Sequence, residues 1–241
     1  IPARIAPTLP RAKTSEIPDV AAAIERYSKP VILVGKSVAD TAASPEAIRL
    51  AEKLDAPILF TRLGKGAVSD RHSAVFGHCH AKVGRSLLES ADGLIAIGCR
   101  FTQIDTRSWE LPIPDHRVQL DVDADELGRE YDIEAGASGD LSCSLEQLCD
   151  QISARSDTDW MRQSSEMAHR IRSAAQPLEL FAAIRKHTDE DALFCVDVTS
   201  LGYRTFDELP IYEPRTYLYP CHSVTLGFGL PAAIGAKLGR P

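Results

Sequence analysis

VILVG at residues 31–35, PILFT at 57–61 and LIAIG at 94–98 decide the fold. Each is a short apolar run with β-branched residues, and the first and third runs end in glycine. Runs of this kind are typical of strands that are buried on both faces of a parallel sheet. VQLDV at 118–122 has the same character and predicts a fourth strand.

Stretches with helical spacing separate these strands. Apolar residues from Val20 to Tyr27 predict a helix before the first strand, and Leu87, Leu88 and Ala91 predict a short helix before the third. Because strands that alternate with helices imply right-handed crossovers, the pattern predicts a parallel sheet. We therefore expect a doubly wound, Rossmann-like α/β domain over residues 18–155.

Capping residues predict two helix starts. Ser44 is the expected N-cap, and Pro45 the expected first-turn residue, of a helix after the first strand. Ser144 and Gln147 fit a capping box that would begin a helix after the fourth strand.

The rest of the chain is organised differently. Residues 1–17 are proline-rich and predict an extended linker, while 156–176 are polar and predict a connecting helix or linker. Residues 177–241 predict a helix, the strand LFCVDV and the helix GLPAAIGAKLG, which together would form an incomplete α/β domain. The chain opens with Ile1 and stops after a helix, so we expect a fragment of a longer protein.

Composition and charge are those of a soluble globular protein. Of 241 residues, 44% are hydrophobic and 25% charged, and the net charge of −7 leaves no electrostatic footprint for nucleic acid. Neither a basic run nor a long apolar stretch points to a membrane. No two cysteines form a C-x-x-C pair, so we expect reduced thiols of a cytoplasmic protein and no metal site: Cys79, Cys99, Cys143, Cys149, Cys195 and Cys221.

The ends of the predicted strands carry glycines, arginines and acids. Ligands of open parallel sheets bind at this edge, where glycine lets a phosphate approach the backbone and arginine pairs with it. The candidates are Gly35, Thr61, Arg62, Leu63, Gly98, Arg100, Asp121 and Asp140. The alternative is that glycines simply end strands and charges solvate loops. Spacing alone favours that alternative, because Gly-Lys-Gly at 64–66 is neither a dinucleotide fingerprint nor a P-loop.

Two further patterns are less specific. His78 and His80 flank Cys79 and could ligate zinc, but no second ligand pair lies nearby in the sequence, which favours an ordinary loop. Asp197 follows a predicted buried strand, where it could bind a ligand or cap the next turn.

The segment TLGFGLPAAIGAK at 225–237 is more informative. Pro231 suits the first turn of a helix, and the small residues after it permit close approach of a backbone or a cofactor. A helix N-terminus that follows glycines also suits a diphosphate. Tight helix packing alone would explain the same residues.

The string TLGFGLPAAIGAKLGRP resembles the opening of the diphosphate-binding domain of acetolactate synthases and related 2-oxo acid decarboxylases. The stretch 29–148 resembles the central domain of the same thiamine-diphosphate enzymes, most clearly in LGKGAVSDRHSAVFGHCHAKVG, ADGLIAIGCRF and VQLDVDADELGREYDIEAGASGDLSCSLEQL. The resemblance covers nearly the whole chain.

The resemblance implies an enzyme that uses thiamine diphosphate and Mg²⁺ to cleave the carboxylate bond of a 2-oxo acid and join the product to a second carbonyl compound. In such enzymes a first domain supplies an activating glutamate and a third domain holds the metal, so we expect no catalytic residue in this chain and no catalysis by it alone. The resemblance also implies a homodimer or homotetramer. By position, Leu226 matches the residue that bends thiamine, and the resemblance implies that Gly227 and Gly229 also contact thiamine diphosphate.

The family's FAD, where present, lies along the central domain. Its contact positions correspond here to the strand-end candidates above together with Gly77 and His78. Lys36 and Ser37 replace further glycines, His80 replaces a glycine and Ile104 replaces an arginine. These departures count against FAD. If the central domain does take FAD, Arg100 is the expected main phosphate partner unless an acid such as Asp105 holds it.

Alternatives remain at this point. The same scaffold serves simple decarboxylases, oxidases and other carboligases, and the residues that would separate them lie largely outside this chain. A non-catalytic module that binds FAD or ADP is the alternative from another class.

Overall fold

A computed structural model describes residues 16–155, 158–220 and 224–240, and the predicted linker 1–17 lies almost wholly outside these ranges. The dominant feature is a six-stranded sheet, parallel throughout, with the strand order β3-β2-β1-β4-β5-β6. Its strands are Pro30–Val34 (β1), Ile58–Phe60 (β2), Val75–His78 (β3), Gly93–Ile97 (β4), Arg117–Asp121 (β5) and Ala135–Ser138 (β6). The predicted α/β fold class is confirmed.

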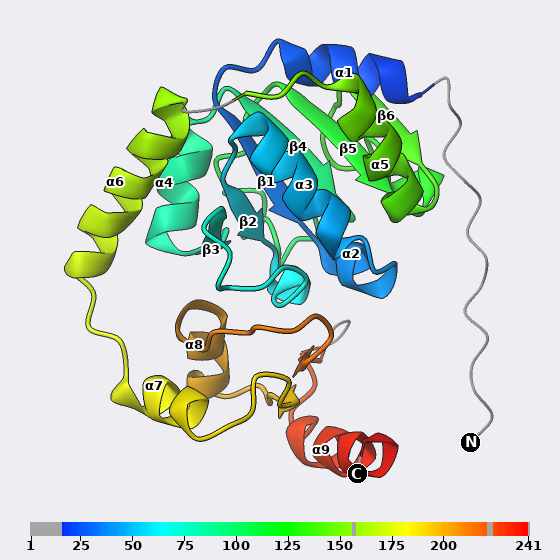
Figure 1. Ribbon diagram of the computed structural model, residues 1–241. Coiled ribbons are helices and arrows are strands. Elements are labelled where there is room, and N and C mark those ends of the chain that lie inside the picture. Colours follow the sequence, from blue (N-terminus) through cyan, green and yellow to red (C-terminus); the bar gives the residue numbers. More distant parts are fainter. Residues whose placement is uncertain (1–15, 156–157, 221–223, 241) are drawn as a thin grey trace.

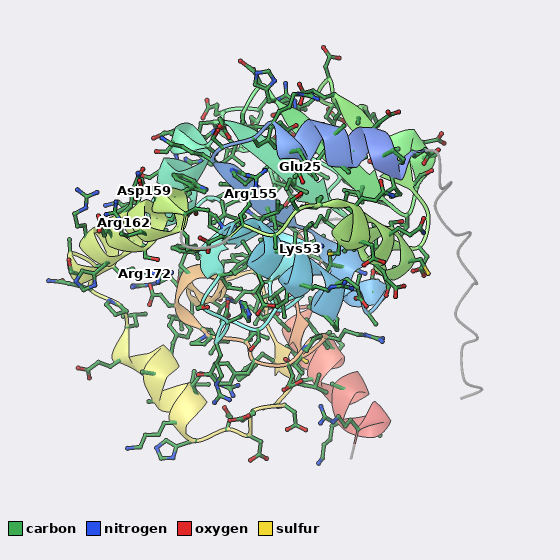
Figure 2. The ribbon with its side chains drawn as sticks, turned by 45° about the horizontal axis from the view of Figure 1, so that its top comes forward. Glu25, Lys53, Arg155, Asp159, Arg162 and Arg172 are labelled. Carbon is green, nitrogen blue, oxygen red and sulfur yellow. The ribbon has the colours of Figure 1, made fainter. Side chains whose placement is uncertain are left out.

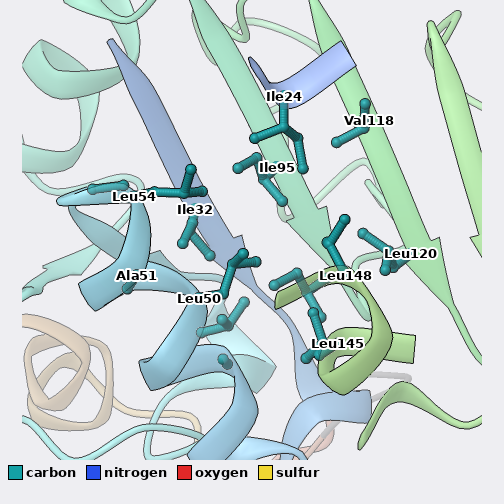
Figure 3. Packing of buried hydrophobic residues seen from close by; sticks show 14 of the residues in the cluster. Ile24, Ile32, Leu50, Ala51, Leu54, Ile95, Val118, Leu120, Leu145 and Leu148 are labelled. Atoms are coloured by element: carbon teal, nitrogen blue, oxygen red, sulfur yellow. The ribbon is translucent and has the colours of Figure 1, made fainter. Parts of the chain in front are cut away.

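Helices cover both faces of this sheet (Figure 1). They are Ile17–Glu25 (α1), Lys36–Asp40 (α2), Ser44–Leu54 (α3), Lys82–Ser90 (α4), Leu141–Gln151 (α5) and Asp159–Ser173 (α6). Alternate residues of each strand face opposite layers: in β1, Ile32 packs with α1, α3 and α5, whereas Leu33 packs with α4 and α6. The first of these two cores is shown in Figure 3, where Leu50, Leu145 and Leu148 meet the strand residues.

The predicted connecting segment 156–176 contains a packed helix. In α6, Trp160 is 3% exposed, and its indole N–H donates to the carbonyl of Pro30 at 2.9 Å. Arg155, which lies beside Glu25 and Lys53 in Figure 2, donates through Nη1 to the carbonyl of Tyr27 at 2.5 Å. Its backbone N–H donates to the carbonyl of Lys53 at 2.7 Å. The chain before α6 therefore ties together the C-terminal ends of α1 and α3.

Two predicted caps are wrong. Helix α3 begins at Ser44 with Ala43 as its N-cap, and the Ser44 hydroxyl donates instead to the carbonyl of Ala67 at 2.5 Å. Helix α5 begins at Leu141, capped by Asp140, whose carboxylate accepts from the N–H of Cys143 at 2.9 Å. The hydroxyl of Ser144 lies within the helix and donates to a backbone carbonyl.

The C-terminal part lies below the six-stranded sheet in Figure 1. It comprises Glu179–Lys186 (α7), Phe194–Cys195 (β7), Ser200–Glu208 (α8), Tyr217–Leu218 (β8) and Gly229–Gly239 (α9). The strand expected at LFCVDV is only two residues long and pairs with β8. Asp70 and Ile211 join the two parts, because each backbone N–H finds an acceptor on the other residue, at 2.8 and 2.7 Å.

Among the helices described, none is long and apolar enough to cross a membrane.

Candidate functional site

The strand order reverses between β1 and β4, and such a switch point opens a crevice at the carboxyl ends of the strands. Gly35 follows β1 and Gly98 follows β4. A Cβ atom at Gly35 would lie 1.9 Å from the carbonyl oxygen of Gly98, so only glycine permits this approach. Gly98 has φ +63°, in the left-handed region that glycine adopts without strain. The two glycines therefore shape the base of the crevice.

A cavity of about 230 Å³ occupies this crevice, and we call it the strand-end groove. It lies at the ends of β1, β2 and β4 and is completed by two residues of the C-terminal part. Its lining is Lys36, Ser37, Asp40, Thr61, Arg62, Leu63, Gly98, Cys99, Arg100, Thr102, Ile104, Asp105, Pro220 and Val224. Five predicted candidates thus meet in one groove: Thr61, Arg62, Leu63, Gly98 and Arg100.

Five other central-domain candidates do not line the groove, and the first is Gly35, which packs against the carbonyl of Gly98. Gly77 and His78 lie on β3, Asp140 caps α5, and Asp121 is buried at the end of β5. Burial raises the pKa of Asp121, and its Oδ2 atom has no hydrogen-bond partner among the described residues. The Oδ1 atom accepts from the N–H of Asp123 at 3.2 Å, which is the geometry of a turn.

Charged side chains in the groove are mostly engaged. The Lys36 ammonium bonds to Asp40. The guanidinium of Arg100 lies 3.5 Å from the carboxylate of Glu126, so its partner is Glu126 and not the expected Asp105. The hydroxyl of Thr102 instead donates to Asp105 at 2.8 Å.

His78, Cys79 and His80 are close together, with one ligand atom of each within 4.8 Å of the others. Burial lowers the pKa of His80 to about 4, although its Nε2 atom lies 2.6 Å from the carbonyl of Asp105. Burial also lowers the pKa of His78 and raises that of the Cys79 thiol. His78 stacks on Phe206 of α8 at 5.2 Å, so these residues help to join the two parts of the molecule.

Asp197 organises the loop before α9. Its Oδ1 atom accepts from the N–H of Val198 at 2.7 Å and of Gly227 at 3.0 Å, and its Oδ2 atom accepts from the N–H of Gly229 at 3.0 Å. Leu226, in the same loop, is 76% exposed. The backbone amides of Gly227 and Gly229 are therefore occupied by a carboxylate within the chain.

Sequence reasoning missed several groove residues. Asp40, Thr102, Pro220 and Val224 belong to segments without a strand-end pattern, so no signal in the sequence placed them there. Asp197 had a signal, because it follows a predicted strand, but its partners lie about 30 residues further along the chain.

Comparison with known proteins gives a consistent family. The model of the thiamine pyrophosphate enzyme central domain matches residues 17–148. Acetolactate synthase isozyme 1 large subunit of Escherichia coli is 30% identical over 96% of this chain and 43% of its own length. Pyruvate oxidase of Lactiplantibacillus plantarum is 22% identical over 98% of this chain and 41% of its own length. The chain thus spans less than half of either relative.

A solved structure from Mycobacterium smegmatis, described as a thiamin diphosphate-dependent enzyme, superposes with a TM-score of 0.75. It covers 98% of this chain and 47% of the other, at 18% identity. At that identity the match supports the fold alone.

Proposed function

This chain belongs to the thiamine pyrophosphate enzymes, and on that premise we propose that its protein acts on a 2-oxo acid such as pyruvate. The observation that carries the proposal is the family match across the six-stranded domain. The reaction would cleave the carboxylate bond and add the remaining fragment to a second carbonyl compound. The name acetolactate synthase among the relatives supports this joining step.

We assign residues 18–155 to the central domain, 156–176 to its connection and 177–241 to the first part of the diphosphate-binding domain. The support is that the family match ends at residue 148 and that the C-terminal strands form a separate two-stranded sheet. We also propose that the intact protein is a homodimer or homotetramer and that it is located in the cytoplasm. Free thiols at the five described cysteines suit a reducing compartment.

Thiamine diphosphate with Mg²⁺ supplies the nucleophilic carbon of the reaction when it is bound. Leu226 fits van der Waals contact with the flat face of a ring, because its side chain is 76% exposed at the start of the glycine loop. Gly227 and Gly229 fit a diphosphate poorly, because Asp197 already occupies their N–H groups. Their contribution would be the shape of the loop that presents Leu226.

The strand-end groove is the proposed nucleotide site. Its position at the switch point supports a nucleotide, and FAD is one candidate. At about 230 Å³ it is smaller than the 300–1,000 Å³ typical of ligand sites, so it suits the phosphate and sugar of a nucleotide rather than a whole dinucleotide.

Assay of the full-length protein with thiamine diphosphate, Mg²⁺ and a panel of 2-oxo acids tests the proposal. We expect release of CO₂ from pyruvate or a close relative, and a joined product when a second carbonyl compound is present. Cofactor-dependent CO₂ release without a joined product would make the enzyme a simple decarboxylase. Consumption of none of the 2-oxo acids, with nucleotide bound, would favour the non-catalytic module instead.

A further inference from the structure

Arg62 differs from the other cations of the strand-end groove. The Lys36 ammonium bonds to Asp40, and Arg100 faces Glu126 at 3.5 Å. Arg62 makes no ion pair and no hydrogen bond with any described residue, and its Nε atom is buried without a partner. Leaving a buried guanidinium donor without an acceptor costs free energy. An anionic ligand that accepted from Arg62 would remove this cost.

Two aromatic rings of α8 hold Arg62 in place. The guanidinium carbon lies 5.3 Å from the ring centre of Phe206 and 5.9 Å from that of Tyr203. Such contacts engage the flat face of a guanidinium and leave its N–H edge available for an anion. The Phe206 ring is itself fixed, because it packs on Tyr219 at 4.9 Å and is 3% exposed.

The acids that line the groove do not pair with the Arg62 guanidinium. Asp40 is engaged by Lys36, and Asp105 accepts from the hydroxyl of Thr102 at 2.8 Å. The charge of Arg62 contributes to lowering the pKa of His78 and of His80, after the larger effect of burial. Arg62 is therefore a groove cation that forms no ion pair with a described residue.

We propose that Arg62 is the anion-binding residue of the strand-end groove and that its ligand is the phosphate group of a nucleotide. The inference rests on the proposed nucleotide role of the groove and identifies the group that such a ligand must present. A guanidinium fork pairs with two phosphate oxygens, and Arg62 lines the groove together with Thr61 and Gly98. Arg100 is a weaker anchor, because its side chain is 52% exposed and already faces a carboxylate.

Calorimetric titration of the full-length protein with ADP, with FAD and with inorganic phosphate tests this proposal. We expect Arg62→Ala to weaken ADP binding at least tenfold and Arg100→Ala to change it less than threefold. Arg62→Lys, which keeps the charge but loses the fork, should fall between wild type and Arg62→Ala. Tyr203→Ala removes an exposed ring that holds Arg62, and we expect a loss of two- to fivefold.

The titrations with inorganic phosphate separate the two possible sources of the anion, a nucleotide and free phosphate. If ADP or FAD binds through Arg62 and inorganic phosphate binds more weakly at the same residue, the ligand is a nucleotide. Phosphate alone, bound as tightly as ADP, would overturn the nucleotide assignment. Equal ADP affinity in wild type and Arg62→Ala, with circular dichroism showing both folded, would overturn the role of Arg62.

Turnover of a 2-oxo acid, measured in the same preparations, keeps the two proposals apart. Turnover without Arg62-dependent ADP binding contradicts only the anion site. Arg62-dependent ADP binding without turnover of any 2-oxo acid contradicts only the proposed reaction.

Discussion

At the scale of single residues, Gly35 and Gly98 determine how closely the backbone after β1 approaches the backbone after β4. We expect Gly35→Ala to lower the free energy of unfolding by about 1–3 kcal/mol, because its Cβ would lie 1.9 Å from a backbone oxygen that cannot move aside. Gly235→Ala is the matched control: outside its own helix turn, no described atom would lie within 4 Å of the new Cβ, and alanine favours the helix by about 1 kcal/mol. Urea denaturation measures the free energy of unfolding of both variants. A Gly35→Ala variant as stable as the wild type would contradict the close approach.

Asp197 carries a second prediction at this scale. Its pKa is held below the usual carboxyl range by the N–H groups of Gly229 and Val198. A carboxyl with a depressed pKa stabilises the fold above its unfolded pKa, and the contribution is lost as pH falls through the folded value. We expect Asp197→Asn to lower the hydrogen-exchange protection of Gly227 and Gly229, because an amide offers one acceptor oxygen where the carboxylate offers two.

Wild-type protein should lose the same protection when pH falls below the ordinary carboxyl range. Asp189→Asn is a suitable control, because no hydrogen bond of its side chain is found within the described chain. Identical protection in wild type and Asp197→Asn would show that the loop holds its shape without the carboxylate.

His80 provides the pH dependence. Burial lowers its pKa to about 4, whereas an unfolded histidine titrates near 6.5. Between these values the unfolded state binds more protons, so this residue makes stability fall as pH decreases from about 6.5 to about 4. We expect an NMR titration midpoint near pH 4 and a shallower loss of thermal stability over that range in His80→Asn. A midpoint near 6.5 would place the ring in water and contradict the structure.

At the scale of elements, the four strands with continuous apolar runs were predictable, and the two edge strands were not. β3 is VFGH, interrupted by a glycine with φ +118°, and β6 is AGAS, which has no large apolar residue. Both owe their strand conformation to pairing with a neighbour, β2 and β5 respectively, and a single segment carries no signal of that pairing.

The lining of the strand-end groove was also predictable only in part. Residues that follow predicted strands were found, because the carboxyl ends of parallel strands share one edge. Pro220 and Val224 were not, because they reach the groove through tertiary packing of the C-terminal part. The free state of Arg62 was also beyond the sequence, since it depends on which acids the other cations engage.

Helix α6 gives the prediction at this scale. Trp160→Phe should lower the free energy of unfolding by about 1–3 kcal/mol, because the buried carbonyl of Pro30 loses its donor at 2.9 Å. Trp109→Phe serves as the control, since Trp109 is 51% exposed, and we expect a change within about 0.5 kcal/mol. Thermal unfolding followed by circular dichroism measures both. Equal stability of the two variants would mean that α6 is a loosely attached connection.

At the scale of the whole molecule, burial is uneven between the two parts. The six-stranded sheet lies between two apolar cores, and β1 and β4 are buried along their entire length. Helix α9 has the opposite character, because Leu230, Ile234 and Leu238 are 73%, 56% and 78% exposed. Few apolar contacts hold α9, and its ties are the Asp197 carboxylate at one end and the Arg240–Asp191 pair at the other.

Amide exchange should therefore reveal two levels of stability in this 241-residue chain. We expect α9 to exchange by local opening at a small free-energy cost, whereas VILVG and LIAIG exchange only on global unfolding. Ile32→Ala, in the core, should cost about 2–5 kcal/mol and lower the protection of the sheet. Leu238→Gln, on the exposed helix face, should leave the sheet unchanged, because it removes no buried contact. Exchange followed by mass spectrometry would decide the matter: if α9 is protected as strongly as β1 and β4 in the monomeric chain, its apolar face is covered in solution and the two parts unfold as one unit.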